Sequence, residues 1–176
     1  WVEMIFEEIQ GLADLLHDSN PADYETNNLR YCKIMERLVN PRILKSLTPS
    51  ELVQIHAGLC WLSMNSSTFS DVIDEELITG GFEFDDNGNN LYVVLDSLLS
   101  HEDFPIEVID HLVHNPEMLY CGFNEPDWVA AKRMPEKLFL RLWNFLEDPF
   151  KRGYRQQMLK NPHLPDSLKG INWWED

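Results

Sequence analysis

Apolar residues at the start of the chain recur at steps of three and four residues. The apolar positions of this segment are Val2, Ile5, Phe6, Ile9, Leu12, Ala13 and Leu16. Such spacing is typical of an α-helix that buries one face, and acidic residues fall on the opposite face. The pattern therefore predicts a helix that begins near Val2 and is stopped by Asn20-Pro21.

A second helix is predicted from about residue 24 to residue 39. Its apolar positions are Tyr31, Ile34, Met35 and Leu38. The helix ends at Asn40-Pro41, because a proline excludes the preceding residue from the helical region. The basic residues of its other face and of the segment that follows are Arg30, Lys33, Arg37, Arg42 and Lys45. We interpret them as a solvated face, or as the internal counterpart of acidic residues elsewhere, and not as a nucleic-acid site.

The clearest helix start is Thr48-Pro49-Ser50-Glu51. Thr48 can cap the helix, Pro49 suits the first helical position, and Glu51 can reach back to close a capping box. The residues expected to be buried are Leu52, Ile55, Leu59 and Leu62. A polar break is expected at residues 65–67. A short acidic helix is expected from residue 70 to 78, ending at Gly80-Gly81.

The segment from residue 82 to 94 has two interpretations. An Asn87-Gly88 turn would pair Phe84 with Leu91 and Phe82 with Val93 in a β-hairpin. In the other interpretation residues 85–89 form a loop, and a helix runs from residue 91 to 99. The helix is preferred, because apolar residues keep helical spacing beyond the point where a short strand would end.

From residue 104 the chain repeats itself. Phe104-Pro105, Met134-Pro135 and Leu164-Pro165 each place an apolar residue and a proline before a predicted helix, and the prolines are 30 residues apart. Regular spacing of such units is the mark of stacked helical repeats. The fold class predicted is all-α: an irregular stack of about eight to ten helices in one domain, with an N-terminal half (1–100), a helical-repeat half (101–170) and a tail (171–176).

One of these units resembles a known repeat family. The residues that carry the resemblance are Pro135, Leu138, Leu142, Asp148, Arg152, Arg155, Asn161-Pro162-His163-Leu164-Pro165 and Leu168, with a looser copy at Pro105, Ile109, Leu112 and Asn115-Pro116. They are similar to the leucine-rich repeat variant, a HEAT-like family of right-handed helical solenoids. The resemblance covers roughly residues 100–170 and implies a binding surface rather than a particular reaction.

Charge is segregated along the chain. Between Lys45 and Lys132 there is no Lys or Arg, whereas this interval holds 16 of the 30 acidic residues. The charge of these 16 residues equals the net charge of the whole chain, which is -16. The flanks share the other 14 acids and all 14 bases. A region of one sign repels nucleic acid and anionic membrane and attracts basic partners.

The helix expected after Pro105 carries part of this acidic interval. Ile106, Ile109, Leu112 and Val113 are expected to face the core, which leaves an outer stripe made of Asp103, Glu107, Asp110 and His114. Carboxylates about 6 Å apart along a helix can face a row of Arg and Lys on a partner, or imitate a phosphate backbone. The residues predicted to bind a partner are Asp71, Asp74, Glu75, Asp103, Glu107, Asp110, Glu117, Trp173 and Trp174. The two tryptophans either cap the last repeat or anchor another chain.

Histidines on the same segment are the weak candidates for a metal site. They are His101, His111 and His114, with Glu107 one turn before His111. Surface histidines beside acidic neighbours are the other interpretation. No HExxH, GxSxG or phosphate-binding glycine loop is present, and His56 with Cys60 is interpreted as packing. We therefore expect no enzyme activity and no cofactor.

Three separated cysteines without CxxC spacing argue against disulfides and fit a reducing cytoplasm. No apolar run is long enough to span a bilayer, and no signal peptide is visible.

The function predicted is a non-catalytic acidic inhibitor, such as an immunity protein or a phage anti-defence protein that mimics nucleic acid, which blocks a basic protein surface. A scaffold or assembly adaptor using the repeat surface and a metal-dependent hydrolase are the alternatives.

Overall fold

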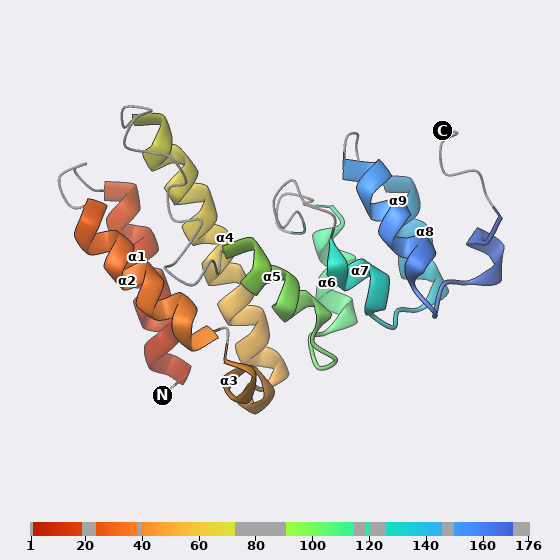
Figure 1. The fold of residues 1–176 in the computed structure, drawn as a ribbon, viewed down its shortest axis with the longest axis horizontal. Helices are drawn as coiled ribbons and strands as arrows, with labels where there is room; N and C mark the ends of the chain where they lie inside the picture. Colours follow the sequence, from red (N-terminus) through yellow and green to blue (C-terminus); the bar gives the residue numbers. More distant parts are fainter. Residues whose placement is uncertain are drawn as a thin grey trace. The chain divides into compact units, whose positions relative to one another are not determined.

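The computed structural model describes residues 2–18, 24–38, 40–72, 91–114, 119, 126–145 and 150–170. These residues form nine α-helices and one 3-10 turn, with no β-strand among them (Figure 1). The prediction of an all-α fold is therefore confirmed. The chain folds into two compact units, residues 1–95 and 96–176.

The first unit is built on the packing of α1 (Val2–Asp18) against α4 (Pro49–Val72). The two helices come close at Gly58, where an added Cβ would lie 3.0 Å from Ile9 Cγ2. Helix α2 (Tyr24–Leu38) packs on α1 and on α3 (Pro41–Ser46). The predicted apolar faces are confirmed where the side chains are described: the fully buried residues include Ile5, Ile9, Leu12, Ile34, Met35 and Leu38.

Helix α4 begins as predicted but continues further. The Thr48 N–H donates to Glu51 Oε1 at 3.0 Å, and the Glu51 N–H donates to Thr48 Oγ1 at 3.2 Å, which completes the capping box. The break expected at residues 65–67 is wrong, because α4 runs through it to Val72. Asn and Ser disfavour a helix by only about 0.7 kcal/mol or less each relative to Ala, so without Pro or Gly they do not end it.

The short acidic helix expected from residue 70 has no separate start. Residues 70–72 belong to α4, and the rest of that prediction lies outside the described residues. Helix α5 (Leu91–Ser100) confirms the preferred interpretation of the segment from residue 82 to 94, which predicted a helix from residue 91. The hairpin is wrong because Leu91 and Val93, which it requires in a strand, are helical. Residues 82–90 lie outside the described part.

The second unit contains a series of helices that follow prolines. They are α6 (Ile106–Leu112), α7 (Asp127–Ala131) and α8 (Glu136–Phe145), followed by α9 (Phe150–Lys160) and the 3-10 turn η4 (Asp166–Leu168). The residues before the three evenly spaced prolines, Phe104, Met134 and Leu164, are buried. The helix expected after Pro165 is only one 3-10 turn. Lys169 is extended and Gly170 has a φ of 88°, which ends the turn.

Polar side chains connect the turns before these prolines. Lys132 Nζ donates to the His101 carbonyl at 2.7 Å. Asn161 Nδ2 donates to the carbonyls of Val129 and Lys132, both at 2.8 Å. The turn at Lys132 is thus bonded to the turn at His101, and Asn161 is bonded to the turn at Lys132 and to Val129 of α7. The first and third turns each contain a similar local hydrogen bond. The Asp103 N–H donates to His101 Nδ1, and the His163 N–H donates to Asn161 Oδ1.

Aromatic residues fill the core beside these turns. Trp128 is fully buried and meets the Tyr154 ring edge-on, with centroids 6.0 Å apart. Tyr154 Oη donates to the Leu119 carbonyl at 2.7 Å. Arg155 lies over the Trp143 ring and donates to the carbonyl of the same residue at 3.0 and 3.2 Å. These contacts join α7, α8 and α9.

Replacing Asn161 with Ala should destabilise the second unit by about 1–3 kcal/mol, because two buried carbonyls lose their donor. Urea unfolding followed by tryptophan fluorescence measures this loss, since Trp128 and Trp143 are buried in the same unit. Asn144→Ala is the matched control at an exposed position of α8 and should leave the unfolding free energy within about 0.5 kcal/mol. Equal unfolding curves for the two variants would contradict a structural role for the Asn161 hydrogen bonds.

Candidate protein-binding surface

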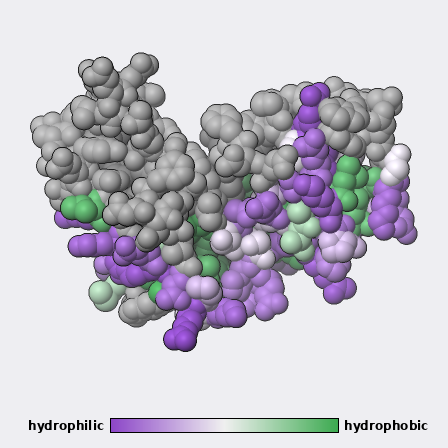
Figure 2. All heavy atoms as spheres, viewed as in Figure 1, coloured by the Kyte–Doolittle hydropathy of each residue, from purple (hydrophilic) through white to green (hydrophobic). Residues whose placement is uncertain are grey.

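The turn before α6 and the first turn of this helix present acidic side chains to solvent. Phe104 and Ile109 are buried, so the opposite side of this segment faces the solvent. Glu102, Asp103 and Glu107 are exposed, and together we name them the acidic face. Among the described residues no Lys, Arg or His forms an ion pair with these three carboxylates. Figure 2 shows hydrophilic residues along the lower edge of the view, where the turn between α5 and α6 lies in Figure 1.

The other half of the predicted stripe is compensated. Arg141 of α8 forms an ion pair with Asp110, and its guanidinium lies 2.6 Å from His114 Nε2. Asp110 and His114 thus contact a base, although no Lys or Arg lies within one helical turn of them in the sequence. Arg141 is 31 residues from Asp110 in sequence, so a search for bases one helical turn away does not find it.

A second base lies beneath the acidic face. Lys132 is only 5% exposed, and its ammonium lies 5.9 Å from the centre of the Phe104 ring. Burial lowers the pKa of Lys132 to about 8, whereas the negative charge of Asp103 acts in the opposite direction. Because its ammonium also donates to the His101 carbonyl, Lys132 supports the turn that carries the acidic face.

Asp96 of α5 belongs to the acidic interval but faces the protein. Its Oδ1 accepts a hydrogen bond of 3.0 Å from the Trp128 N–H in the first turn of α7. Burial raises the pKa of Asp96 to about 6, and the charge of Asp127 adds to the rise, while backbone hydrogen bonds from Trp128 and Asp127 oppose it. Asp96 therefore caps a helix from a distant segment, which no spacing in the sequence indicates.

The histidine candidates do not come together as a metal site. His101 accepts the Asp103 N–H through Nδ1, and His114 contacts Arg141. His111 and Glu107 are exposed on α6. Within the described ranges, no three His, Cys, Asp or Glu side chains are placed to hold a metal ion.

The pair His56 and Cys60 and the other predicted partner-binding residues remain to be placed. His56 and Cys60 are buried in α4, with Cys60 Sγ 3.8 Å from His56 Nε2. Burial raises the pKa of the Cys60 thiol to about 12, so the thiol stays protonated and the pair packs, as predicted. Asp71 lies in α4, but its side chain does not belong to the part of the chain that the structure describes. The other predicted partner-binding residues that lie outside the described part are Asp74, Glu75, Glu117, Trp173 and Trp174.

Replacing Asp96 with Asn should change how stability depends on pH. The folded-state pKa of about 6 lies above the ordinary value of 3.8, so wild-type stability falls as pH rises between these values. Asn keeps an acceptor for the Trp128 N–H without the buried charge. The variant should therefore gain stability relative to wild type from pH 4 to pH 7, by roughly 1 kcal/mol after allowance for solvent screening.

Chemical unfolding at several pH values measures this difference. Glu102→Gln removes one exposed carboxylate in the same unit and serves as the matched control. A free-energy difference between Asp96→Asn and wild type that stays constant across this pH range would refute the buried-carboxylate interpretation.

Comparisons with protein-family models, curated proteins and solved structures gave no significant match to the chain. No described helix combines the length and the apolar character needed to cross a bilayer. The functional conclusion therefore depends on the residues and geometry of the chain itself.

Proposed function

We propose that this chain is a non-catalytic protein-binding module that docks the acidic face onto a basic surface of another protein and blocks it. The observation that carries this proposal is the exposure of Glu102, Asp103 and Glu107 without an ion-pair partner among the described residues. An inhibitor of the immunity or phage anti-defence type, acting as a mimic of nucleic acid, is the function that fits this surface best.

The acidic face suits a cluster of cations. Asp103 lies in the turn before α6, and Glu107 lies in the first turn of this helix. Arg and Lys side chains on a partner can meet these exposed carboxylates through charge-assisted hydrogen bonds. The surplus negative charge would also steer the encounter and make its rate sensitive to salt.

A local effect accounts for part of this pattern. Carboxylates near a helix N-terminus interact favourably with the helix dipole, typically by roughly 0.3–1 kcal/mol each. Glu107 lies in the first turn of α6, so its presence stabilises the helix. The dipole does not account for the absence of Lys and Arg from residue 46 to 131, and this absence favours an external cation.

The bonded turns support a finer proposal for the architecture. We infer that residues 100–170 are an irregular HEAT-like repeat in which Lys132 and Asn161 join consecutive turns. In such arrays each unit stacks on its neighbours, and the outer surface is free to bind a partner. The acidic face lies on the first of these turns, which the Lys132 hydrogen bond joins to the next one.

A scaffold or adaptor is the second candidate. A cavity of about 360 Å³ follows one side of α8, where Leu140 is 36% exposed. Such a surface can bind a partner without any role for the acidic residues. For either function we propose a cytoplasmic location, because Cys60 is a buried free thiol and a reducing compartment preserves it.

Reversing Glu102, Asp103 and Glu107 to Lys should abolish capture of basic proteins from a lysate of the source cell at low salt. Wild-type protein should retain them until the salt concentration is raised, because screening removes the attraction. For a captured partner, stopped-flow measurements should give an association rate at least about tenfold lower for the triple variant.

The matched control reverses Glu7, Asp14 and Glu36, three exposed acids of the first unit, and thus changes the net charge by the same amount. It should capture the same proteins as wild type. Capture that survives reversal of the acidic face, or is lost equally in both variants, would remove the proposal. Capture that depends on Leu140 instead would favour the adaptor.

A further inference from the structure

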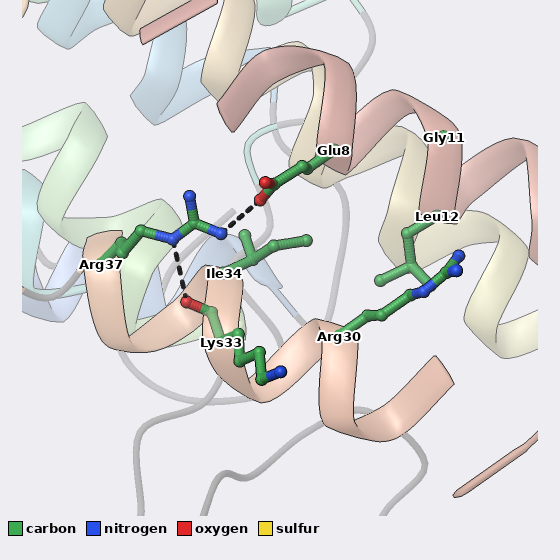
Figure 3. Close-up of a pocket in the computed structure, with 7 residues that line it drawn as sticks. All are labelled: Glu8, Gly11, Leu12, Arg30, Lys33, Ile34 and Arg37. Atoms are coloured by element: carbon green, nitrogen blue, oxygen red, sulfur yellow. Dashed lines mark hydrogen bonds and ion pairs between the residues drawn. The ribbon is translucent and has the colours of Figure 1, made fainter. Parts of the chain in front are cut away.

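A cavity of about 300 Å³ opens between α1 and α2 in the first unit (Figure 3). It is lined by Glu8, Gly11, Leu12, Arg30, Lys33, Ile34 and Arg37. The three bases lie on α2 and the single acid lies on α1. This volume is at the lower end of the range for small-molecule sites, which begins at about 300 Å³.

The charge of this cavity is opposite to that of the chain. Three bases and one acid give it a formal charge of +2, in a protein with a net charge of -16. Arg37 forms an ion pair with Glu8 and donates from Nε to the Lys33 carbonyl at 3.3 Å. Arg30 and Lys33 are exposed and form no ion pair with any side chain that the structure describes. With respect to the described side chains, two of the three cations therefore remain available to a ligand.

The base of the cavity is apolar. Leu12 and Ile34 are each 2% exposed and contribute the hydrophobic part of the lining. In Figure 3 the Arg30 side chain extends toward Leu12, while Glu8 and Arg37 meet at the other end of the cavity. A ligand between these groups would touch an apolar surface and cations at the same time.

Gly11 widens the cavity at a cost to the helix. It lies inside α1, where Gly is less favourable than Ala by roughly 1 kcal/mol. A Cβ added at Gly11 meets no atom within 4 Å, and its φ is not positive. Neither packing against the described residues nor backbone conformation requires glycine here, and its effect is to leave space in the cavity wall.

We propose that this cavity binds a small phosphate monoester with an apolar body. Arg30 and Lys33 would bind the phosphate, and the apolar body would lie against Leu12 and Ile34. A phosphate monoester carries a charge of about -1.5 to -2 at pH 7, which matches the formal charge of the cavity. The planar guanidinium can also donate two parallel hydrogen bonds to phosphate oxygens.

This site is independent of the proposed inhibitor function. It lies in the first unit and attracts anions, whereas the acidic face lies in the second unit and attracts cations. An experiment can therefore refute ligand binding at the cavity without refuting protein capture by the acidic face, and the reverse also holds.

Isothermal titration of the whole chain with phenyl phosphate tests this proposal. Wild-type protein should bind one equivalent saturably, at least about tenfold more tightly than inorganic phosphate, because only the ester has an apolar body. Phenol, which lacks the charge, should show no saturable binding. The double variant Arg30→Gln with Lys33→Gln should weaken binding of phenyl phosphate at least about tenfold.

Two glycines provide a matched pair of variants. Gly11→Leu fills the cavity and should abolish binding, whereas Gly153→Leu changes a helical glycine of α9 outside the cavity and should bind like wild type. Both should remain folded by circular dichroism, since an added Cβ meets open space at both positions. Undetectable binding to wild type, or equal affinity of Gly11→Leu and Gly153→Leu, would overturn the proposal. Tighter binding of a short polyglutamate peptide than of phenyl phosphate would overturn the choice of ligand.

Discussion

The second unit depends on hydrogen bonds from two buried polar side chains to backbone carbonyls of earlier turns. Lys132 reaches back to His101, and Asn161 reaches back to Val129 and Lys132. A carbonyl buried without a donor costs about 1–3 kcal/mol, so these bonds fix which turn lies beside which. The helices that follow Pro105 and Pro135 start from turns held in this way, and the orientation of the acidic face follows from it.

Tertiary contacts divide the acidic interval into parts with different roles. Glu51 closes the capping box of α4 and Asp96 caps α7. Asp110 forms an ion pair with Arg141. Near α6, only Glu102, Asp103 and Glu107 are exposed and form no ion pair with a described residue. A uniform stretch of charge in the sequence thus becomes structural support in some places and, at the acidic face, an exposed surface for which we propose a binding role.

The two units present surfaces of opposite sign. The acidic face suits a flat basic protein surface, because its carboxylates project from a turn and a helix start. The basic cavity between α1 and α2 is concave and has an apolar base, which suits a small ligand. The two proposed sites therefore differ in the sign of their charge and in their shape, and a different class of ligand is proposed for each.

Local patterns in the sequence determined α1, α2 and α5 and the starts of α4, α6 and α8, because periodicity, proline and capping residues act over a few residues. The helices α3, α7 and α9 were not predicted. The capping box at Thr48 and Glu51, the buried face of α1 and the proline before α8 could all be predicted in this way. The extension of α4 past Asn65 was not predicted, since a polar sequence does not by itself end a helix. Only the tertiary structure decided that Asp96 caps α7, that Arg141 neutralises Asp110, and that the bases of α2 surround a cavity. Each of these depends on residues brought together from separate helices, and the energy of a contact between distant residues leaves no periodic trace in the sequence.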